Sequence, residues 1–164
     1  MGPGLNTDSS FHQIDTPLGV FQLEIGPKGI RNFWPKDEQI NPQNSVSNPK
    51  ISEIKSALEA FFSGNHIALD SIAVDPEGTT FQKLTWKALR TIPPGTTFSY
   101  SKLAEQIDKP GSFRAVARAC ATNPVALFIP CHRVIAKDGS LSGFRAGVDM
   151  KRELLKLEGC ANFL

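Results

Sequence analysis

The chain of 164 residues is poor in the features that mark exported, membrane-spanning or disulfide-bonded proteins. It has no run of about 18 apolar residues, and its start, MGPGLNTDSS, lacks the basic and apolar stretches of a signal peptide. Three cysteines are an odd number, which argues against a disulfide framework. We therefore expect a soluble protein with reduced thiols, cytoplasmic or, in a eukaryote, nuclear.

Net charge is also scarce, since the formal total is only +2. This total hides two unlike halves. Residues 1–76 carry 5 Lys or Arg against 9 Asp or Glu, whereas residues 77–164 carry 13 against 7. Clustered cations suit a polyanion partner such as nucleic acid. A basic face that is only solvated explains the same charge equally well, so composition leaves both interpretations open.

The first half of the sequence predicts a small α+β unit after a disordered tail over residues 1–10. Between residues 11 and 34, apolar residues alternate around turns at residues 17–19 and 26–29, which predicts two or three antiparallel strands. A loop over residues 41–49 follows. The next segment predicts a helix that Gly64 ends, and its apolar face consists of Ile51, Ile54, Leu58, Phe61 and Phe62.

Charge and pattern both change around residues 75–78, which predicts a boundary there. The expected parts are an N-terminal α+β domain over residues 11–76 and a mainly helical C-terminal domain over residues 77–164. Thr79 or Thr80 is expected to cap the first helix of the second domain. We predict that this helix turns Phe81, Leu84, Ala88 and Leu89 inward and carries Trp86 on its flank.

Two short helices follow, and Gly111 lies in the turn between them. Ser99 is expected to cap the first helix and Ser112 the second, which predicts a helix-turn-helix. On the second helix Arg114 and Arg118 share a polar side with only small neighbours, so it could approach a DNA groove closely. An ordinary alanine-rich helix with solvated arginines has the same pattern. The stripe that we expect in the core consists of Phe113, Val116, Ala117 and Cys120.

Residues 128–135 form an apolar strand interrupted by Pro-Cys-His-Arg. Pro130 denies a ladder hydrogen bond, so we expect an edge or a bend that exposes Cys131 to a cavity. Cys131 is a candidate nucleophile because His132 and Arg133 supply the imidazole and the cation that lower a thiol's pKa. Adjacent side chains in extended backbone point apart, so contact between Cys131 and His132 needs a bend or a water. A buried, inert cysteine is the alternative.

The last predicted helix runs over residues 148–158, and Gly159 ends it. Glu158 falls among buried leucines at the negative end of the helix dipole, where a carboxylate needs a partner. The imidazole of His132 would satisfy it. A structural pair with Lys151 or an arginine is an equal alternative.

In their order and spacing, these motifs resemble the O6-alkylguanine-DNA alkyltransferase family. The match extends over residues 77–159, and residues 16–64 resemble the family's variable N-terminal domain more weakly. The matching segments are 78–82, 92–95, 99–100, 114–116, 123–124, 129–134, 143–145 and 154–159, together with Trp86. The resemblance agrees with an α+β fold: a small antiparallel sheet with a helix, then a mainly helical domain with a helix-turn-helix.

The resemblance implies direct repair of double-stranded DNA by a monomer that needs no cofactor. Cys131 takes the alkyl group from O6-alkylguanine, and from O4-alkylthymine, and keeps it, so that one molecule repairs one lesion. Glu158 orients His132, His132 deprotonates Cys131 through a water, and Tyr100 donates to the base.

The same resemblance implies roles in binding. The damaged nucleotide must leave the stacked duplex, and Arg114 fills the space that it vacates. Asn123 links the recognition helix to the cysteine loop. The expected DNA contacts are Tyr100, Ser101, Arg114, Ala115 and Arg118, the last on a phosphate. The expected walls of the base pocket are Val134, Phe144 and Arg145.

Some departures from the family stand out. Phe144 replaces a common tyrosine, and Pro94 a common aromatic residue. Some members bind zinc in the N-terminal domain, but here that domain has only His12 and His66 and no cysteine, so we predict no metal. An alternative is a related lesion-binding module, but such modules lack the acceptor cysteine. The presence of Cys131 argues against that function. A cysteine hydrolase would need oxyanion donors, for which no motif is present.

Overall fold

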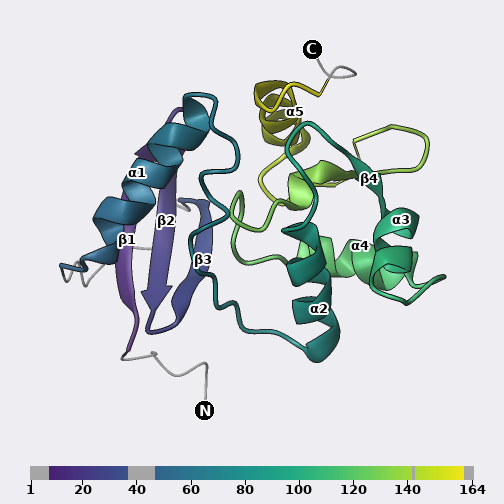
Figure 1. Cartoon of the computed structure of the whole chain (residues 1–164), viewed down its shortest axis with the longest axis horizontal. Helices are drawn as coiled ribbons and strands as arrows, with labels where there is room; N and C mark the ends of the chain where they lie inside the picture. The colour runs from purple at the N-terminus through teal and green to yellow at the C-terminus, as the bar shows by residue number, and fades with distance from the viewer. Residues whose placement is uncertain (1–7, 37–46, 142, 161–164) are drawn as a thin grey trace.

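The computed structural model describes residues 8–36, 47–141 and 143–160. A three-stranded antiparallel sheet with one helix forms the N-terminal half, and helices dominate the C-terminal half (Figure 1). The α+β class and the order of the parts are therefore as predicted. No helix in these ranges has both the length and the hydropathy that crossing a membrane requires. Most of the loop predicted over residues 41–49 lies outside the described residues.

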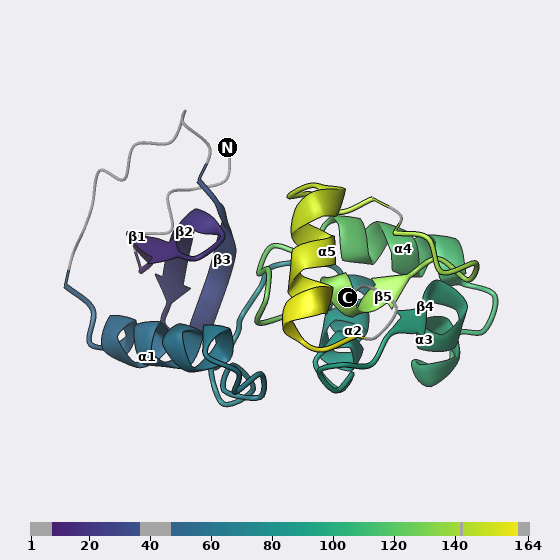
Figure 2. The same ribbon diagram turned by 90° about the horizontal axis from the view of Figure 1, so that it is seen from above.

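The sheet consists of β1 (Ser10–Thr16), β2 (Gly19–Gly26) and β3 (Gly29–Pro35), paired in that order and joined at the two predicted turns. Helix α1 (Lys50–Phe62) lies along one face of it (Figure 2). Alternate residues along the strands point to that face and are buried, whereas the residues between them form an outer face with mainly polar side chains. The hydrophobic face therefore closes on α1.

The tail predicted over residues 1–10 is wrong at its C-terminal end. Ser10 already belongs to β1, where it pairs with Ile25. Ser9 accepts a hydrogen bond of 2.9 Å from the Arg31 guanidinium. Residues 1–7 lie outside the described residues.

Strand β3 joins the sheet to the C-terminal half. The Phe33 N–H donates to the Pro124 carbonyl at 2.9 Å, and the Phe33 carbonyl accepts from the Ala126 N–H at 2.8 Å. The Phe33 ring also meets Phe128 edge-on, with centroids 5.2 Å apart. Buried apolar residues of both halves form one cluster. The domain boundary near residue 76 stays a prediction, since the halves share this core.

Helix α2 (Thr80–Leu89) begins as predicted, because Thr79 and Gln82 form a reciprocal capping box. Its predicted inner face is partly wrong, although Leu89 is completely buried and Phe81 and Ala88 pack against the core. Trp86 is buried and donates its indole N–H to the Ala119 carbonyl at 2.8 Å, whereas Leu84 is 39% exposed. The partner for the indole comes from another helix, so the spacing within α2 could not show that Trp86 turns inward.

The predicted helix-turn-helix corresponds to α3 (Tyr100–Gln106) and α4 (Phe113–Ala121). Ser99 caps α3 by accepting from the Lys102 N–H. Ser112 stands at the start of α4, but its side chain makes no capping hydrogen bond to any described residue. The apolar stripe is also partly wrong, because Val116 and Cys120 are buried but Phe113 is 44% exposed.

The apolar strand predicted over residues 128–135 is mostly absent. A 3₁₀ turn, η1 (Cys131–Arg133), precedes the short strand β5 (Val134–Ile135), which pairs in parallel with β4 (Phe98–Ser99). Helix α5 (Val148–Leu157) then ends with Glu158 as its C-cap, and Gly159 adopts a φ of +79°. This end of the chain matches the prediction.

Candidate active site

Glu158 is the centre of a buried polar group at the end of α5. Its Oε1 accepts from the His132 Nε2–H at 3.0 Å. Arg133 donates to the same carboxylate from Nε, at 3.0 and 3.2 Å, and from Nη2, at 2.6 Å. The sequence left a histidine and an arginine as alternative partners, and Glu158 binds both.

Arg133 has a larger part in this group than the sequence indicated. Its Nη1 also donates to the Ile92 carbonyl at 2.6 Å, so the buried guanidinium ties α5 and η1 to the turn after α2. The turn comes close to α5 at Gly95, whose φ is +82° and where an added Cβ would lie 3.2 Å from the Glu158 carbonyl oxygen. From the sequence, Arg133 is named only as a cation near Cys131, because its contacts with Glu158 and Ile92 join segments that are distant in sequence.

The hydrogen bonds of Glu158 define the protonation states. Burial would raise the pKa of Glu158, but its interactions with His132, together with the hydrogen bonds and the charge of Arg133, outweigh burial and lower that pKa to about 2. Burial lowers the pKa of His132, and the nearby cations Arg133 and Lys151 lower it further against the opposing effect of Glu158. Glu158 is therefore ionised and His132 neutral at pH 7.

His132 in this neutral form has one nitrogen available. Because Nε2 carries the hydrogen that bonds to Glu158, Nδ1 is the basic nitrogen. Nδ1 is buried and has no hydrogen-bond partner among the described residues. A buried imidazole with an unpaired nitrogen can accept a proton from a nearby acid.

Cys131 lies in the 3₁₀ turn η1, which provides the predicted bend, and it is buried, with 4% of its surface exposed. Its exposure to a cavity stays a prediction. Burial raises the pKa of the thiol. A hydrogen bond from the Asn123 side chain and the charge of Lys151 act in the opposite direction. The thiol is therefore protonated at neutral pH and needs a base, while Asn123 and Lys151 favour its thiolate form.

Lys151 is a residue whose part the sequence did not identify. Its side chain is 1% exposed, and its Nζ donates to the Val134 carbonyl at 2.7 Å. The sequence offered Lys151 as a partner for Glu158, but the structure directs it to β5, close enough for its charge to act on Cys131. A buried lysine on an apolar stripe was the available signal.

Asn123 lies between α4 and the loop that leads to Cys131. Its Nδ2 donates to the Ile129 carbonyl at 2.8 Å, and its Oδ1 accepts from the Val125 N–H at 2.9 Å. The Asn123 carbonyl accepts from the Trp34 indole at 2.8 Å. These bonds support a tight loop in which Leu127 has a φ of +69°, a conformation that is rare for leucine.

The predicted DNA-binding residues cluster on α3 and α4. Arg114 and Arg118 are both exposed on α4, and the Arg114 guanidinium lies 5.7 Å from the Phe113 ring centroid. Ala115 is partly exposed. Tyr100 and Ser101, both partly buried, begin α3 directly after β4. The parallel pairing of β4 with β5 places this helix start beside the strand that follows Cys131.

The predicted pocket residues occupy unlike positions. Val134 is completely buried in β5, whereas Phe144 is partly exposed and Arg145 is exposed in the loop before α5. Both loop residues pack on Trp34 of β3: the Phe144 ring centroid is 5.7 Å from it and the Arg145 guanidinium is 4.8 Å away. The sequence did not assign Trp34 to the site.

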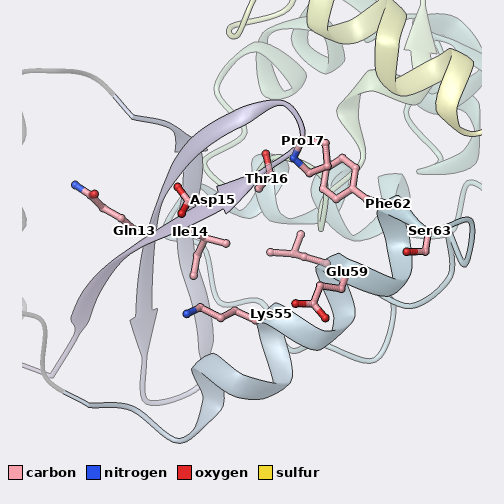
Figure 3. A pocket seen from close by; sticks show the side chains of 10 residues that line it. Gln13, Ile14, Asp15, Thr16, Pro17, Lys55, Glu59, Phe62 and Ser63 are labelled. Atoms are coloured by element: carbon pink, nitrogen blue, oxygen red, sulfur yellow. The ribbon is translucent and has the colours of Figure 1, made fainter.

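A cavity of about 480 Å³ lies elsewhere, between the end of β1 and α1. Figure 3 shows Lys55 and Glu59 on α1 facing Asp15 and Thr16 of β1. The lining of this cavity contains none of the predicted site residues, so the cavity is not the candidate active site. Among the described residues, no three His, Cys, Asp or Glu side chains are grouped to hold a metal ion. The absence of a metal stays a prediction.

Comparison with known proteins identifies the family of this chain. Residues 80–160 match the family model described as 6-O-methylguanine DNA methyltransferase, DNA binding domain. A methylated-DNA–protein-cysteine methyltransferase from Methanosarcina barkeri is 44% identical over 149 residues, which cover 88% of this chain and 94% of that protein. This chain belongs to the methylated-DNA–protein-cysteine methyltransferase family. The family model covers the predicted catalytic residues but not Trp34.

Solved structures of this methyltransferase family are similar along nearly the whole chain. The Mycobacterium tuberculosis O6-methylguanine methyltransferase has a TM-score of 0.79 and 37% identity, and the match covers 92% of each chain. The Mycobacterium tuberculosis OGT in complex with DNA has a TM-score of 0.78 and 39% identity over 91% of this chain and 92% of that chain.

Proposed function

We propose that this member of the family repairs double-stranded DNA by transferring the alkyl group of O6-alkylguanine to Cys131. The observation that carries the proposal is the buried group in which Glu158 binds both Arg133 and the neutral His132, next in sequence to the thiol. The similarity of the chain to a methylated-DNA–protein-cysteine methyltransferase and to an O6-methylguanine methyltransferase supports the same reaction.

The transfer begins with the removal of the thiol proton. His132 Nδ1 receives this proton through a water that bridges it to Cys131, while Glu158 stabilises the imidazolium that forms. The thiolate attacks the alkyl carbon, so an S–C bond forms as the bond from carbon to guanine O6 breaks. Tyr100 donates a proton to the departing base. The thioether cannot return to the thiol, which limits each molecule to one transfer.

The lesion must reach a thiol that is 4% exposed. An alkyl group within a stacked duplex cannot do so unless the nucleotide rotates out of the helix. Arg114, exposed on α4, fills the vacated position, and Arg118 contacts a phosphate. Tyr100, Ser101 and Ala115 complete the DNA contacts. The protein acts as a monomer, and O4-alkylthymine is a second substrate because its alkyl group is also carried by an exocyclic oxygen of the base.

The decisive experiment measures stoichiometry and position together. Protein is incubated with duplex DNA that contains one O6-methylguanine, and its mass and peptides are then analysed. We expect one added methyl group per molecule, on the peptide of Cys131, and none on Cys120 or Cys160. Cys131→Ala should take up none.

Other outcomes would identify other functions. Binding of the lesion without any gain in protein mass would indicate a recognition module. Release of alkyl product beyond one equivalent would indicate a hydrolase with turnover. Methyl uptake by Cys131→Ala would exclude Cys131 as the acceptor.

A further inference from the structure

Trp34 is buried on the face of the sheet that is mainly polar. In the register of the sheet it pairs with Gln22, which in turn pairs with the exposed Gln13. Its neighbour Phe33 points to the opposite face, among the buried aromatic residues. Trp34 is nevertheless only 7% exposed. Residues outside the sheet must therefore cover it.

The covering residues come from the candidate active site. The Arg145 guanidinium lies 4.8 Å from the Trp34 ring centroid, within range of a cation–π contact. The Phe144 ring lies at 5.7 Å with an interplanar angle of 49°. Both residues belong to the loop that is expected to wall the base pocket. The indole side chain thus supports this loop from the N-terminal sheet.

The indole N–H of the same ring reaches the acceptor side of the site. It donates to the Asn123 carbonyl at 2.8 Å in a buried hydrogen bond. The Asn123 side chain donates to the Ile129 carbonyl at 2.8 Å, two residues before Cys131, and it counteracts the raised pKa of the Cys131 thiol. The Trp34 side chain therefore contacts both the pocket loop and the residue that anchors the segment before the thiol.

We propose that Trp34 is a positioning residue that sets the distance between the pocket wall and Cys131, and so determines how large an alkyl group the site accepts. The proposal rests on the proposed function. The carbon of a benzyl group aligns with the Cys131 sulfur only if the loop of Phe144 and Arg145 holds the phenyl ring in place, because misplacement of a reacting group sharply slows transfer. A methyl group needs little of that wall, so its transfer depends on Trp34 much less.

The chain contains a matched control for this proposal. Trp86 is the second of its two tryptophans, is 3% exposed, and donates its indole N–H to a backbone carbonyl at the same distance of 2.8 Å. Its acceptor is Ala119 on the recognition helix. Truncation of either indole loses similar burial, but only Trp34 contacts the pocket loop.

The test compares two lesions in duplexes of one sequence, O6-benzylguanine and O6-methylguanine, so that DNA docking is common to both. For the full chain and its Trp34→Leu and Trp86→Leu variants, we would measure the second-order transfer rate constants and the groups transferred per molecule. Trp34→Leu should lower the benzyl constant about tenfold and the methyl constant less than about threefold. The final stoichiometry should stay at one group per folded molecule.

Two more variants keep the test decisive. Trp34→Phe retains a ring for Phe144 and Arg145, so it should restore most of the ratio of benzyl to methyl rates. Trp34→Met has about the volume of leucine but a flexible side chain that adapts to the vacated space, so should Trp34→Leu not fold, it is expected to show the same selective loss.

The proposal is overturned if the Trp34 variants slow both lesions equally, or if Trp86→Leu changes the ratio as much. It is also overturned if Trp34→Phe behaves like Trp34→Leu. Failure of the proposed function is distinct from these results, because the unaltered protein would then transfer neither group to Cys131.

Discussion

Arg133 holds both carboxylate oxygens of Glu158, with Nη2 2.6 Å from Oε2 and Nε 3.0 Å from Oε1. This pairing neutralises a buried charge at the negative end of α5, where the helix dipole opposes it. His132 can therefore remain uncharged while it donates to the same carboxylate. The ion pair is the structural component of the site, and the imidazole is the component that can move a proton.

The first prediction concerns the stability that this ion pair provides. Glu158→Gln removes the buried partner of Arg133 and should lower the free energy of unfolding by about 3 kcal/mol. Glu153→Gln on the same helix is the control, because its pair with Lys156 is exposed and spans 3.7 Å, so it should cost less than about 0.5 kcal/mol. Urea unfolding measures both, and equal losses would contradict a special role for Glu158.

The second prediction concerns acid. The pKa of Glu158 is lowered from 4.5 to about 2, so its ionised form contributes stability above pH 4.5 that is lost as the pH falls from 4.5 towards 2. The lowered pKa of His132 also makes stability fall with falling pH, beginning at pH 6.5. Below this pH His132 binds a proton in the unfolded chain but stays neutral in the folded chain until its lowered pKa is reached. Stability should therefore fall continuously below pH 6.5.

Unfolding free energies between pH 7 and pH 3 measure this dependence. Glu158→Gln should flatten the curve below pH 4.5, because it removes the carboxylate that must be protonated. Phe113→Ala is a control that removes an exposed side chain and no titratable group, so its curve should run parallel to that of the unaltered protein. A Glu158→Gln curve as steep as the original below pH 4.5 would show that other carboxylates cause the loss.

The third prediction concerns the thiol. Burial raises the pKa of Cys131, while Asn123 and Lys151 counteract that rise, so Asn123→Ala and Lys151→Met should each raise the pKa further. One pH unit would slow alkylation by iodoacetamide at pH 7 about tenfold. A background with Cys120→Ala and Cys160→Ala isolates the signal. Lys156 lies on the same helix as Lys151 but is exposed, so Lys156→Met should leave the pH dependence of alkylation unchanged. An unchanged pH dependence for Asn123→Ala and Lys151→Met would contradict the prediction.

The sequence predicted the elements of the site well because its signals there are local. Ser99 and Thr79 mark helix starts through hydrogen bonds to residues three positions later. Gly159 follows the last helix for an equally local reason. The prediction that Glu158 needs a buried partner also followed from its position on its own helix.

The errors arise where the deciding contact comes from a distant segment. Trp86 turns inward because Ala119 offers a carbonyl, and Cys131 lies in a 3₁₀ turn where the next two residues bond to Glu158 and Ile92. Trp34 could not be assigned to the site because its strand alternation places it on the polar face. Only the folded chain brings the pocket loop onto that ring.

The fourth prediction tests the corrected face of α4. Val116 is completely buried, so Val116→Ala should lower the free energy of unfolding by about 2 kcal/mol. Phe113 was predicted in the core but is 44% exposed, so Phe113→Ala should cost less than about 1 kcal/mol despite the larger truncation. Chemical unfolding compares them directly. A greater loss for Phe113→Ala would restore the original stripe.

The fifth prediction separates the two arginines of α4, which are both exposed and lie one turn apart. Arg114→Ala should slow transfer from duplex DNA at least about tenfold more than transfer from free O6-benzylguanine, because the free base needs no rotation out of a stack. Arg118→Ala should instead weaken binding to intact duplexes of any sequence and reduce the slope of log affinity against log salt by about 1. Rate measurements on both substrates and salt titrations of DNA binding give these values. Equal slowing of duplex and free base by Arg114→Ala would remove its role in extrusion, and an unchanged salt slope would remove Arg118 from the phosphate contacts.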